Sequence, residues 1–305
     1  MKLVYFDEFR LGALRDESIV VDVSEVVAGI PHAGPHDLII GLISDFESYR
    51  PALEQAIADG EGIDIATVRL RPPLPRPGCI DCMAVNYMED GTRSEPAPIN
   101  AFHKSPTCVI GDGDTMILPD MPATIFEGEA ELAVVIGSVA DKVSRETALD
   151  HIFGYINFID GSARGVPPFY QMKSRATFAP IGPWLVTRDE IKDPQNLSVR
   201  LWNNGEIKQS FNTSDMAHDI ARCIEWVSSI HTLMPGDILA TGTNHQGLHA
   251  FQDGDKIELE VEGLGRLHVK VRDELKRTWP RHTRKEHHEQ GLKGVPGQTG
   301  GKYTE

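Results

Sequence analysis

The stretch Glu127-Gly128-Glu129-Ala130-Glu131-Leu132-Ala133-Val134-Val135-Ile136-Gly137 places carboxylates at alternate positions and then continues as an apolar strand. Because successive side chains of a strand point to opposite faces, Glu129 and Glu131 are predicted to lie on the same face. Two carboxylates entering an apolar strand together are unfavourable unless solvent or a cation neutralises them. The stretch therefore predicts either a solvated acidic strand end or a site for a divalent cation.

A third acid, Asp160, follows the predicted strand Tyr155–Ile159 and opens into the loop Gly161-Ser162-Ala163-Arg164-Gly165. The end of a strand is a suitable place for a metal ligand, and carboxylate oxygens suit Mg²⁺, Mn²⁺ or Ca²⁺ better than Zn²⁺. No spacing rule connects Asp160 to the Glu129 and Glu131 pair. From the residues alone, both interpretations remain open.

Strand-like runs dominate the sequence on both sides of this stretch. The expected strands cover residues 80–85, 108–110, 131–136, 155–159, 184–187, 197–201, 256–261 and 267–271. Turn sequences such as Gly111-Asp112-Gly113-Asp114 separate many of them. One helix is expected after the N-cap candidate Ser144, and another is expected to begin near Ser214 with an apolar face extending to Ile230. The pattern predicts a mixed, β-rich α+β fold.

The chain divides into three parts by composition. Residues 1–75 combine short strands with one helix expected from Leu38 to Ala58, and they end in a Pro-rich linker, which indicates a small N-terminal α/β domain. Residues 76–280 form the main, strand-rich domain. Residues 281–305 are charged and rich in Gly and His, so they are expected to be a polar tail or an arm on a neighbouring subunit.

Charge and cysteine content exclude several functional classes. The chain has 305 residues and a formal net charge of -15, which argues against a nucleic-acid partner and against an anionic membrane surface. No apolar run approaches the length of a membrane span. Cys79 and Cys82 form a CxxC, but no second pair completes a zinc site, so buried strand cysteines are expected. These observations favour a cytoplasmic protein.

Several motifs, in their order and approximate spacing, resemble the fumarylacetoacetate hydrolase family across residues 78–275. They are Asn86-Tyr87, Phe102–Pro106, Glu129–Gly137, Gly154–Arg164, Lys173-Ser174, Pro180–Trp184, Gly242-Thr243 and Glu262–Gly265. The resemblance implies a β-sandwich roll that is usually a homodimer. It also implies that Glu129, Glu131 and Asp160 hold Mg²⁺, or Mn²⁺ or Ca²⁺.

The resemblance further implies a small anionic oxo-acid substrate. Arg164, Lys173 and Thr243 match residues that bind its carboxylate or oxo groups, and Lys173 faces the reacting centre. Family members act on 2-oxo or 1,3-dicarbonyl acids through an enolate, which a divalent ion stabilises. Hydrolysis of a carbon-carbon bond in a 2,4-dioxo acid is the first expectation. Alternatives are a 2-oxo acid decarboxylase, tautomerase or hydratase, and a non-catalytic homologue.

One motif of hydrolytic members is missing. They carry a His and, three residues later, a Glu as a general-base pair, whereas the corresponding positions here are Asp90 and Arg93. Gly165 also replaces an acid that usually follows the Arg164 position. Substitute bases could come from Glu89, Asp90 or Glu95, or from His103 and His245 if the fold brings them close. Glu89 and Asp90 are the catalytic candidates beside Lys173.

Overall fold

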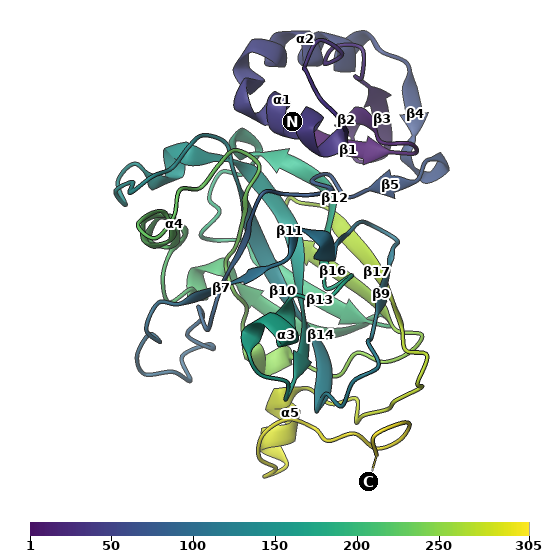
Figure 1. The fold of residues 1–305 in the computed structure, drawn as a ribbon, viewed down its shortest axis with the longest axis vertical. Helices are drawn as coiled ribbons and strands as arrows, with labels where there is room; N and C mark the ends of the chain where they lie inside the picture. The colour runs from purple at the N-terminus through teal and green to yellow at the C-terminus, as the bar shows by residue number, and fades with distance from the viewer. Residues whose placement is uncertain (305) are drawn as a thin grey trace.

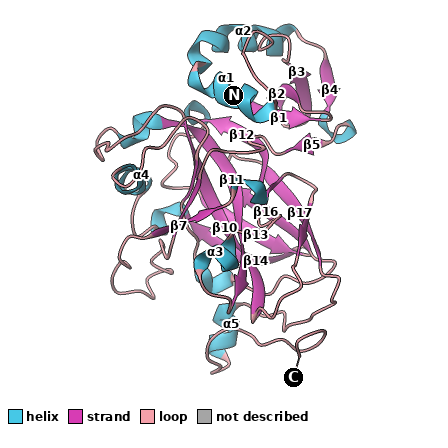
Figure 2. Ribbon diagram, in the orientation of Figure 1, coloured by secondary structure: helices cyan, strands magenta, loops and turns pink. Residues whose placement is uncertain are grey.

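Two β-sheets form the body of the molecule (Figure 1). The computed structural model describes residues 1–304. Over these residues the larger sheet has twelve strands, with β4-β3-β2-β1-β12-β11-β10-β15-β6-β7 in order, β5 beside β1 and β8 beside β12. The smaller sheet has five strands in the order β14-β13-β16-β17-β9. The β-rich α+β prediction is confirmed, and helices lie at the periphery (Figure 2).

The larger sheet contains β1 (Lys2–Phe6), β2 (Arg10–Asp16), β3 (Ile19–Asp22), β4 (Gly62–Asp64), β5 (Leu70–Arg71), β6 (Ile80–Met83), β7 (Ala101–Lys104), β8 (Val109–Ile110), β10 (Ile125–Ile136), β11 (Ile152–Arg164), β12 (Ala179–Thr187) and β15 (Ile238–Ala240). The smaller sheet contains β9 (Thr115–Ile117), β13 (Ser198–Asn203), β14 (Glu206–Asn212), β16 (Lys256–Val261) and β17 (Arg266–Arg272). The α-helices are α1 (Pro35–Ser44), α2 (Phe46–Asp59), α3 (Phe169–Lys173), α4 (Ile220–Ser228) and α5 (Arg284–Glu289).

Strand β10 is the centre of the larger sheet, and all of its residues are buried. It pairs with β11 along nearly its whole length and with β15 on the other side. Its even-numbered side chains, such as Leu132 and Val134, join the core that includes the smaller sheet. Its odd-numbered face carries the glutamates first and then Ala133 and Val135, which join a second core with the N-terminal helices. The alternation predicted from sequence is therefore confirmed.

The N-terminal segment continues the larger sheet. Strand β1 pairs antiparallel with β12, with Leu3 opposite Leu185, and α1 and α2 lie beyond it at one end of the molecule (Figure 1). The single helix expected from Leu38 to Ala58 is wrong, because two helices meet at Asp45, which has a non-helical backbone (φ −134°). The break allows Phe46 to pack edge-on against Phe153, with ring centroids 5.0 Å apart.

Two other helix predictions need correction. The segment after Ser144 forms no α-helix and contains only the 3₁₀ turn Ala148–His151. The later helix, α4, starts at Ile220, because the carboxylate of Asp219 accepts the backbone N–H of Arg222 and so caps the helix there. Capping by Asp219 therefore sets a helix boundary that the apolar pattern did not reveal.

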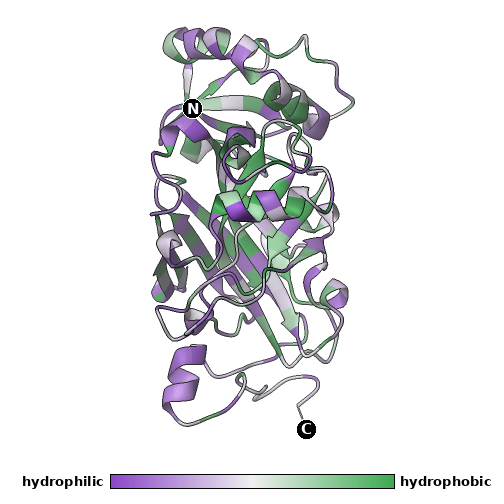
Figure 3. Cartoon of the chain, turned by 90° about the vertical axis from the view of Figure 1, so that its left-hand side faces the viewer, coloured by the Kyte–Doolittle hydropathy of each residue, from purple (hydrophilic) through white to green (hydrophobic). Residues whose placement is uncertain are grey.

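The C-terminal segment folds back onto the same chain. A capping box between Thr283 and Glu286 starts α5, and the Arg284 guanidinium Nε lies 3.0 Å from Glu127 Oε1. Thr278 forms an isolated bridge with Gly300. Figure 3 shows α5 as a hydrophilic helix at the end of the molecule opposite the N-terminal part. Salt bridges and hydrogen bonds anchor this segment, which has few apolar side chains.

Among residues 1–304, no helix has both the length and the apolar character required to cross a lipid bilayer. All four cysteines are free. Cys82 is buried within β6, as predicted, whereas Cys79 immediately precedes the strand and is only half-buried.

Replacing Gly154 with Ala is expected to destabilise the contact between β11 and β12. A Cβ at this position would lie 2.1 Å from the Val186 carbonyl oxygen, so the strand backbones would have to separate. We expect Gly154→Ala to lower the free energy of unfolding by about 1–3 kcal/mol, measured by urea denaturation. Gly29→Ala is the matched control, because its new Cβ meets no atom within 4 Å. Equal stability of the two variants would contradict the packing described.

His249 makes stability depend on pH. It is buried, its Nε2 accepts the Asn203 amide at 3.0 Å, and its Nδ1–H donates to the Gly247 carbonyl at 3.3 Å. Burial lowers the pKa of His249 to about 4. Since an unfolded imidazole has a pKa of about 6.5, the unfolded chain binds more protons between these values, and acid destabilises the folded state.

We expect the wild type to lose about 2 kcal/mol more than His249→Gln in free energy of unfolding between pH 7 and pH 5, because the amide does not titrate. Urea denaturation of both proteins at each pH measures the difference. The same pH slope in both would show that His249 is not buried as a neutral imidazole.

Candidate metal centre and adjoining cavity

The three predicted metal ligands come together on one face of the β10–β11 pair. Glu129 and Asp160 are directly opposite each other in the register, and Glu131 lies two residues further along β10. One carboxylate oxygen from each lies within 4.8 Å of the others, and all three residues are buried. The strand pairing thus supplies the connection to Asp160 that sequence spacing lacked.

The donor set fits a hard divalent cation. Glu131 Oε2 accepts the backbone N–H of Gly242 at 2.7 Å, but Glu131 Oε1 is buried and has no hydrogen-bond partner among the described residues. Burial, together with the charges of Asp160 and Glu129, raises the pKa of Glu131 well above its usual value. A cation with oxygen ligands would satisfy the unpartnered oxygen and remove the repulsion.

Two buried lysines balance the acidic charges. Lys173 Nζ lies 2.7 Å from Glu129 Oε1 and also contacts Asp160 Oδ2. Lys104 Nζ lies 2.6 Å from Asp160 Oδ1 and donates to the Gly161 carbonyl at 3.0 Å. Although burial opposes ionisation, Lys173 and Arg164 hold the pKa of Glu129 below its usual value. Glu129 is therefore held as a carboxylate by its ion pair with Lys173.

Arg164 connects this network to solvent. It ends β11, contacts Glu129, and its Nε lies 3.0 Å from Glu127 Oε2. Glu127 in turn binds Arg284 of α5, so two guanidinium groups share one buried carboxylate. Despite burial, Glu129 and Glu127 raise the pKa of Arg164, which keeps it cationic.

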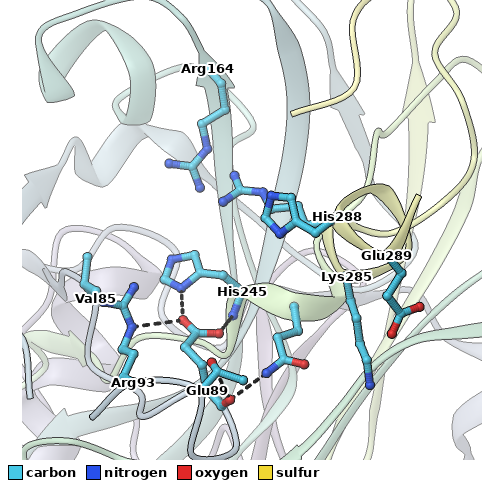
Figure 4. Close-up of a pocket in the computed structure, with 11 residues that line it drawn as sticks. Val85, Glu89, Arg93, Arg164, His245, Lys285, His288 and Glu289 are labelled. Carbon is cyan, nitrogen blue, oxygen red and sulfur yellow. Dashed lines mark hydrogen bonds and ion pairs between the residues drawn. The ribbon is translucent and has the colours of Figure 1, made fainter. Parts of the chain in front are cut away.

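A cavity of about 770 Å³ adjoins the network, and Arg164 is part of its wall (Figure 4). Its lining also includes the cations Arg93, Arg284 and Lys285. Their concentration at one cavity, in a chain whose formal net charge is -15, favours an anionic small molecule.

Glu89 and His245 line the cavity and contact each other through their side chains (Figure 4). The His245 Nδ1 lies 2.6 Å from Glu89 Oε1, and the His245 backbone N–H donates to Glu89 Oε2 at 2.8 Å. Because a carboxylate accepts, the Nδ1 must carry the proton, which leaves Nε2 with a free lone pair when the ring is neutral. Arg93 lies 3.8 Å from the same carboxylate.

The other predicted site residues lie outside the cavity lining. The exposed Asp90 accepts the Asn244 side-chain amide at 3.1 Å. Thr243 is buried, and its hydroxyl donates to the Ala130 carbonyl at 2.7 Å while accepting from Gln209 at 2.9 Å. The hydroxyl of Thr243 is thus used within the protein, and its substrate-binding role remains a prediction.

Sequence reasoning did not assign roles to Lys104, Glu127 or Arg284. Lys104 belongs to a recognised motif, but only the fold shows that its ammonium group reaches Asp160. The pairing of Glu89 with His245 joins residues 156 positions apart. Side-chain alternation could have placed Glu127 on the Glu129 face, whereas nothing in the pattern locates Arg284 there.

Comparison with known proteins gives a consistent result. The fumarylacetoacetate hydrolase C-terminal model matches residues 80–272. The chain is 33% identical over 288 residues to a maleylpyruvate hydrolase of Aquipseudomonas alcaligenes, covering 89% of this chain and 99% of that protein. It is 36% identical over 219 residues to the oxaloacetate tautomerase YisK of Bacillus subtilis, covering 67% of this chain and 73% of that protein.

The fold is also similar to a solved structure. The crystal structure of maleylpyruvate hydrolase from Sphingobium sp. SYK-6, in complex with manganese(II) and pyruvate, matches with a TM-score of 0.82 and 35% identity. The match covers 90% of this chain and 99% of that chain. The family model, the relatives and this structural match lead to one assignment: the chain belongs to the fumarylacetoacetate hydrolase family.

Proposed function

We propose that the protein is a divalent-metal-dependent hydrolase that cleaves a carbon-carbon bond in a 2,4-dioxo acid of the maleylpyruvate type. The Glu89–His245 pair carries this proposal, because it supplies a base beside the cationic cavity where the expected sequence motif is missing. Similarity to two maleylpyruvate hydrolases supports the substrate class.

Glu129, Glu131 and Asp160 would hold the divalent ion. The ion would act as a Lewis acid toward adjacent oxo and carboxylate oxygens and so stabilise enolate character in the leaving fragment. We propose Mg²⁺ or Mn²⁺, with Ca²⁺ as a further carboxylate-binding ion. The buried Lys173, next to two of these ligands, would pair with the substrate carboxylate or the developing oxyanion.

His245 would act as the general base. Glu89 holds the ring with Nδ1–H toward its carboxylate, so Nε2 can take a proton from water. The water oxygen bonds to the C4 carbonyl carbon, the bond between C3 and C4 breaks, and its electron pair passes to C3. The proton held by His245 is then delivered to C3, which gives one carboxylic acid and one 2-oxo acid. Arg164, Arg93 and Arg284 would bind the substrate carboxylates.

A tautomerase is the second candidate, supported by the similarity to an oxaloacetate tautomerase. The same His245 could move a proton between carbon and oxygen without an attacking water. A decarboxylase would also need no water. Product analysis distinguishes the three: hydrolysis yields two acids, decarboxylation releases carbon dioxide, and tautomerisation yields neither.

We also retain the homodimer and the cytoplasmic location as proposals, together with a role in the catabolism of aromatic compounds. Four free cysteines suit a reducing compartment. The family resemblance supports the homodimer.

Glu131→Gln is expected to separate metal binding from folding. Without metal, the Tm of the variant should be no lower than that of the wild type, because the substitution removes one of three crowded buried carboxylates. Excess Mn²⁺ should raise the Tm of the wild type and not that of the variant. The exposed Glu8→Gln serves as control and should respond as the wild type does. An equal Mn²⁺ response in Glu131→Gln would remove Glu131 from the metal site.

His245→Ala and Glu89→Gln are expected to lower kcat for pyruvate release from maleylpyruvate by about 10²–10⁴-fold, because they remove the base or its orienting partner. Both should keep the Mn²⁺-dependent rise in Tm, since neither residue is a proposed ligand. Asp90→Asn is the matched control and should keep near-wild-type kcat, since Asp90 lies outside the cavity lining. Full activity in His245→Ala with loss in Asp90→Asn would refute the assignment.

A further inference from the structure

A second group of ligand-type side chains lies on the strand pair β6–β7. One ligand atom each from Cys79, Asp81, His103 and His231 lies within 4.8 Å of the others. Asp81 and His103 face each other in the register, Cys79 immediately precedes β6, and His231 follows α4. The four residues are thus gathered from three parts of the chain.

This group lies on the opposite face of the strand from the carboxylate triad. Because side chains alternate along β6, Cys82 points away from Asp81. Burial raises the pKa of the Cys82 thiol, and the nearby charges of Asp160 and Glu131 raise it further. The two groups of ligand-type residues are therefore separated by the strand pair itself.

The side chain of Asp81 gives a second, independent indication that a cation binds here. Its side chain is 3% exposed, and its Oδ2 has no hydrogen-bond partner among the described residues. Its Oδ1 lies 2.8 Å from His103 Nε2 and 3.2 Å from His231 Nε2. A buried carboxylate oxygen without a partner is unfavourable, and a bound cation would satisfy it.

The donor atoms indicate which cation the site would bind. Sulfur and imidazole nitrogen suit Zn²⁺, whereas Mg²⁺ and Ca²⁺ prefer oxygen. Zinc bonds of about 2.0 Å to nitrogen and oxygen place neighbouring ligand atoms of a tetrahedron about 3.3 Å apart. The separation of Asp81 Oδ1 from His231 Nε2, 3.2 Å, matches this value, and its separation from His103 Nε2, 2.8 Å, is somewhat shorter.

We propose that Cys79, Asp81, His103 and His231 bind a zinc ion at a site separate from the catalytic metal. Strand β7 is at the edge of the larger sheet, so the ion would tie this edge to β6 and to the segment after α4. Because a thiolate is the form that binds zinc, the ion would displace the proton of the Cys79 thiol.

The experiment uses the full chain carrying Glu131→Gln, so that bound metal reports on the second site. After EDTA treatment the protein is titrated with Co²⁺ and then with Zn²⁺. We expect the visible bands of tetrahedral Co²⁺, a near-ultraviolet thiolate-to-cobalt band, and displacement of the cobalt by zinc. A folded protein with no tetrahedral Co²⁺ spectrum would overturn the proposal.

Single variants in the same background identify the ligands. Cys79→Ser should abolish the thiolate band. The His103 side chain is 62% exposed, so His103→Ala should be tolerated by the fold. It should weaken zinc binding by at least about 10–100-fold, the loss typical when a residue that only hydrogen-bonds to a metal ligand is replaced. Cys82→Ser should retain the thiolate band. Circular dichroism of each variant shows whether it is folded. A band that survives Cys79→Ser would also overturn the proposal.

Discussion

Charge compensation on the buried face of the β10–β11 pair constrains the rest of this structure. The strand register places Glu129 beside Asp160 and keeps Glu131 on the same face. Buried charges without partners cost several kcal/mol each, by order of magnitude. The fold meets this requirement by bringing Lys104 from β7 and Lys173 from α3 to the same point. The positions of these two elements are thus connected to the chemistry of one strand pair.

The negative charges of Glu129 and Glu131 are not compensated equally by protein cations. Lys173 and Arg164 surround Glu129, whereas Glu131 keeps an oxygen with no partner and a raised pKa. The network therefore holds two carboxylates in place with protein cations and leaves the third to be satisfied by an external one. This arrangement would orient the proposed ligand set before an ion binds.

Regular alternation made part of the site predictable. It placed Glu129 and Glu131 on one face, and family motifs added Asp160, Lys173 and Arg164. Contacts between residues far apart in the sequence could not be predicted, because the sequence does not show which loops lie close together in the fold. The pairing of Glu89 with His245 is an example. Helix boundaries failed for a similar reason, since the non-helical turn at Asp45 and the capping carboxylate of Asp219 override an apolar pattern.

The C-terminal segment has a consequence for how such an enzyme can diversify. Arg284 and Lys285 line the cavity, yet both lie beyond residues 80–272, the region that matches the family model. The carboxylates that would hold the metal lie within that region. Replacement of this peripheral helix would therefore change the cavity lining and leave the metal-binding carboxylates unchanged. Part of substrate recognition would then change independently of the residues that carry the reaction.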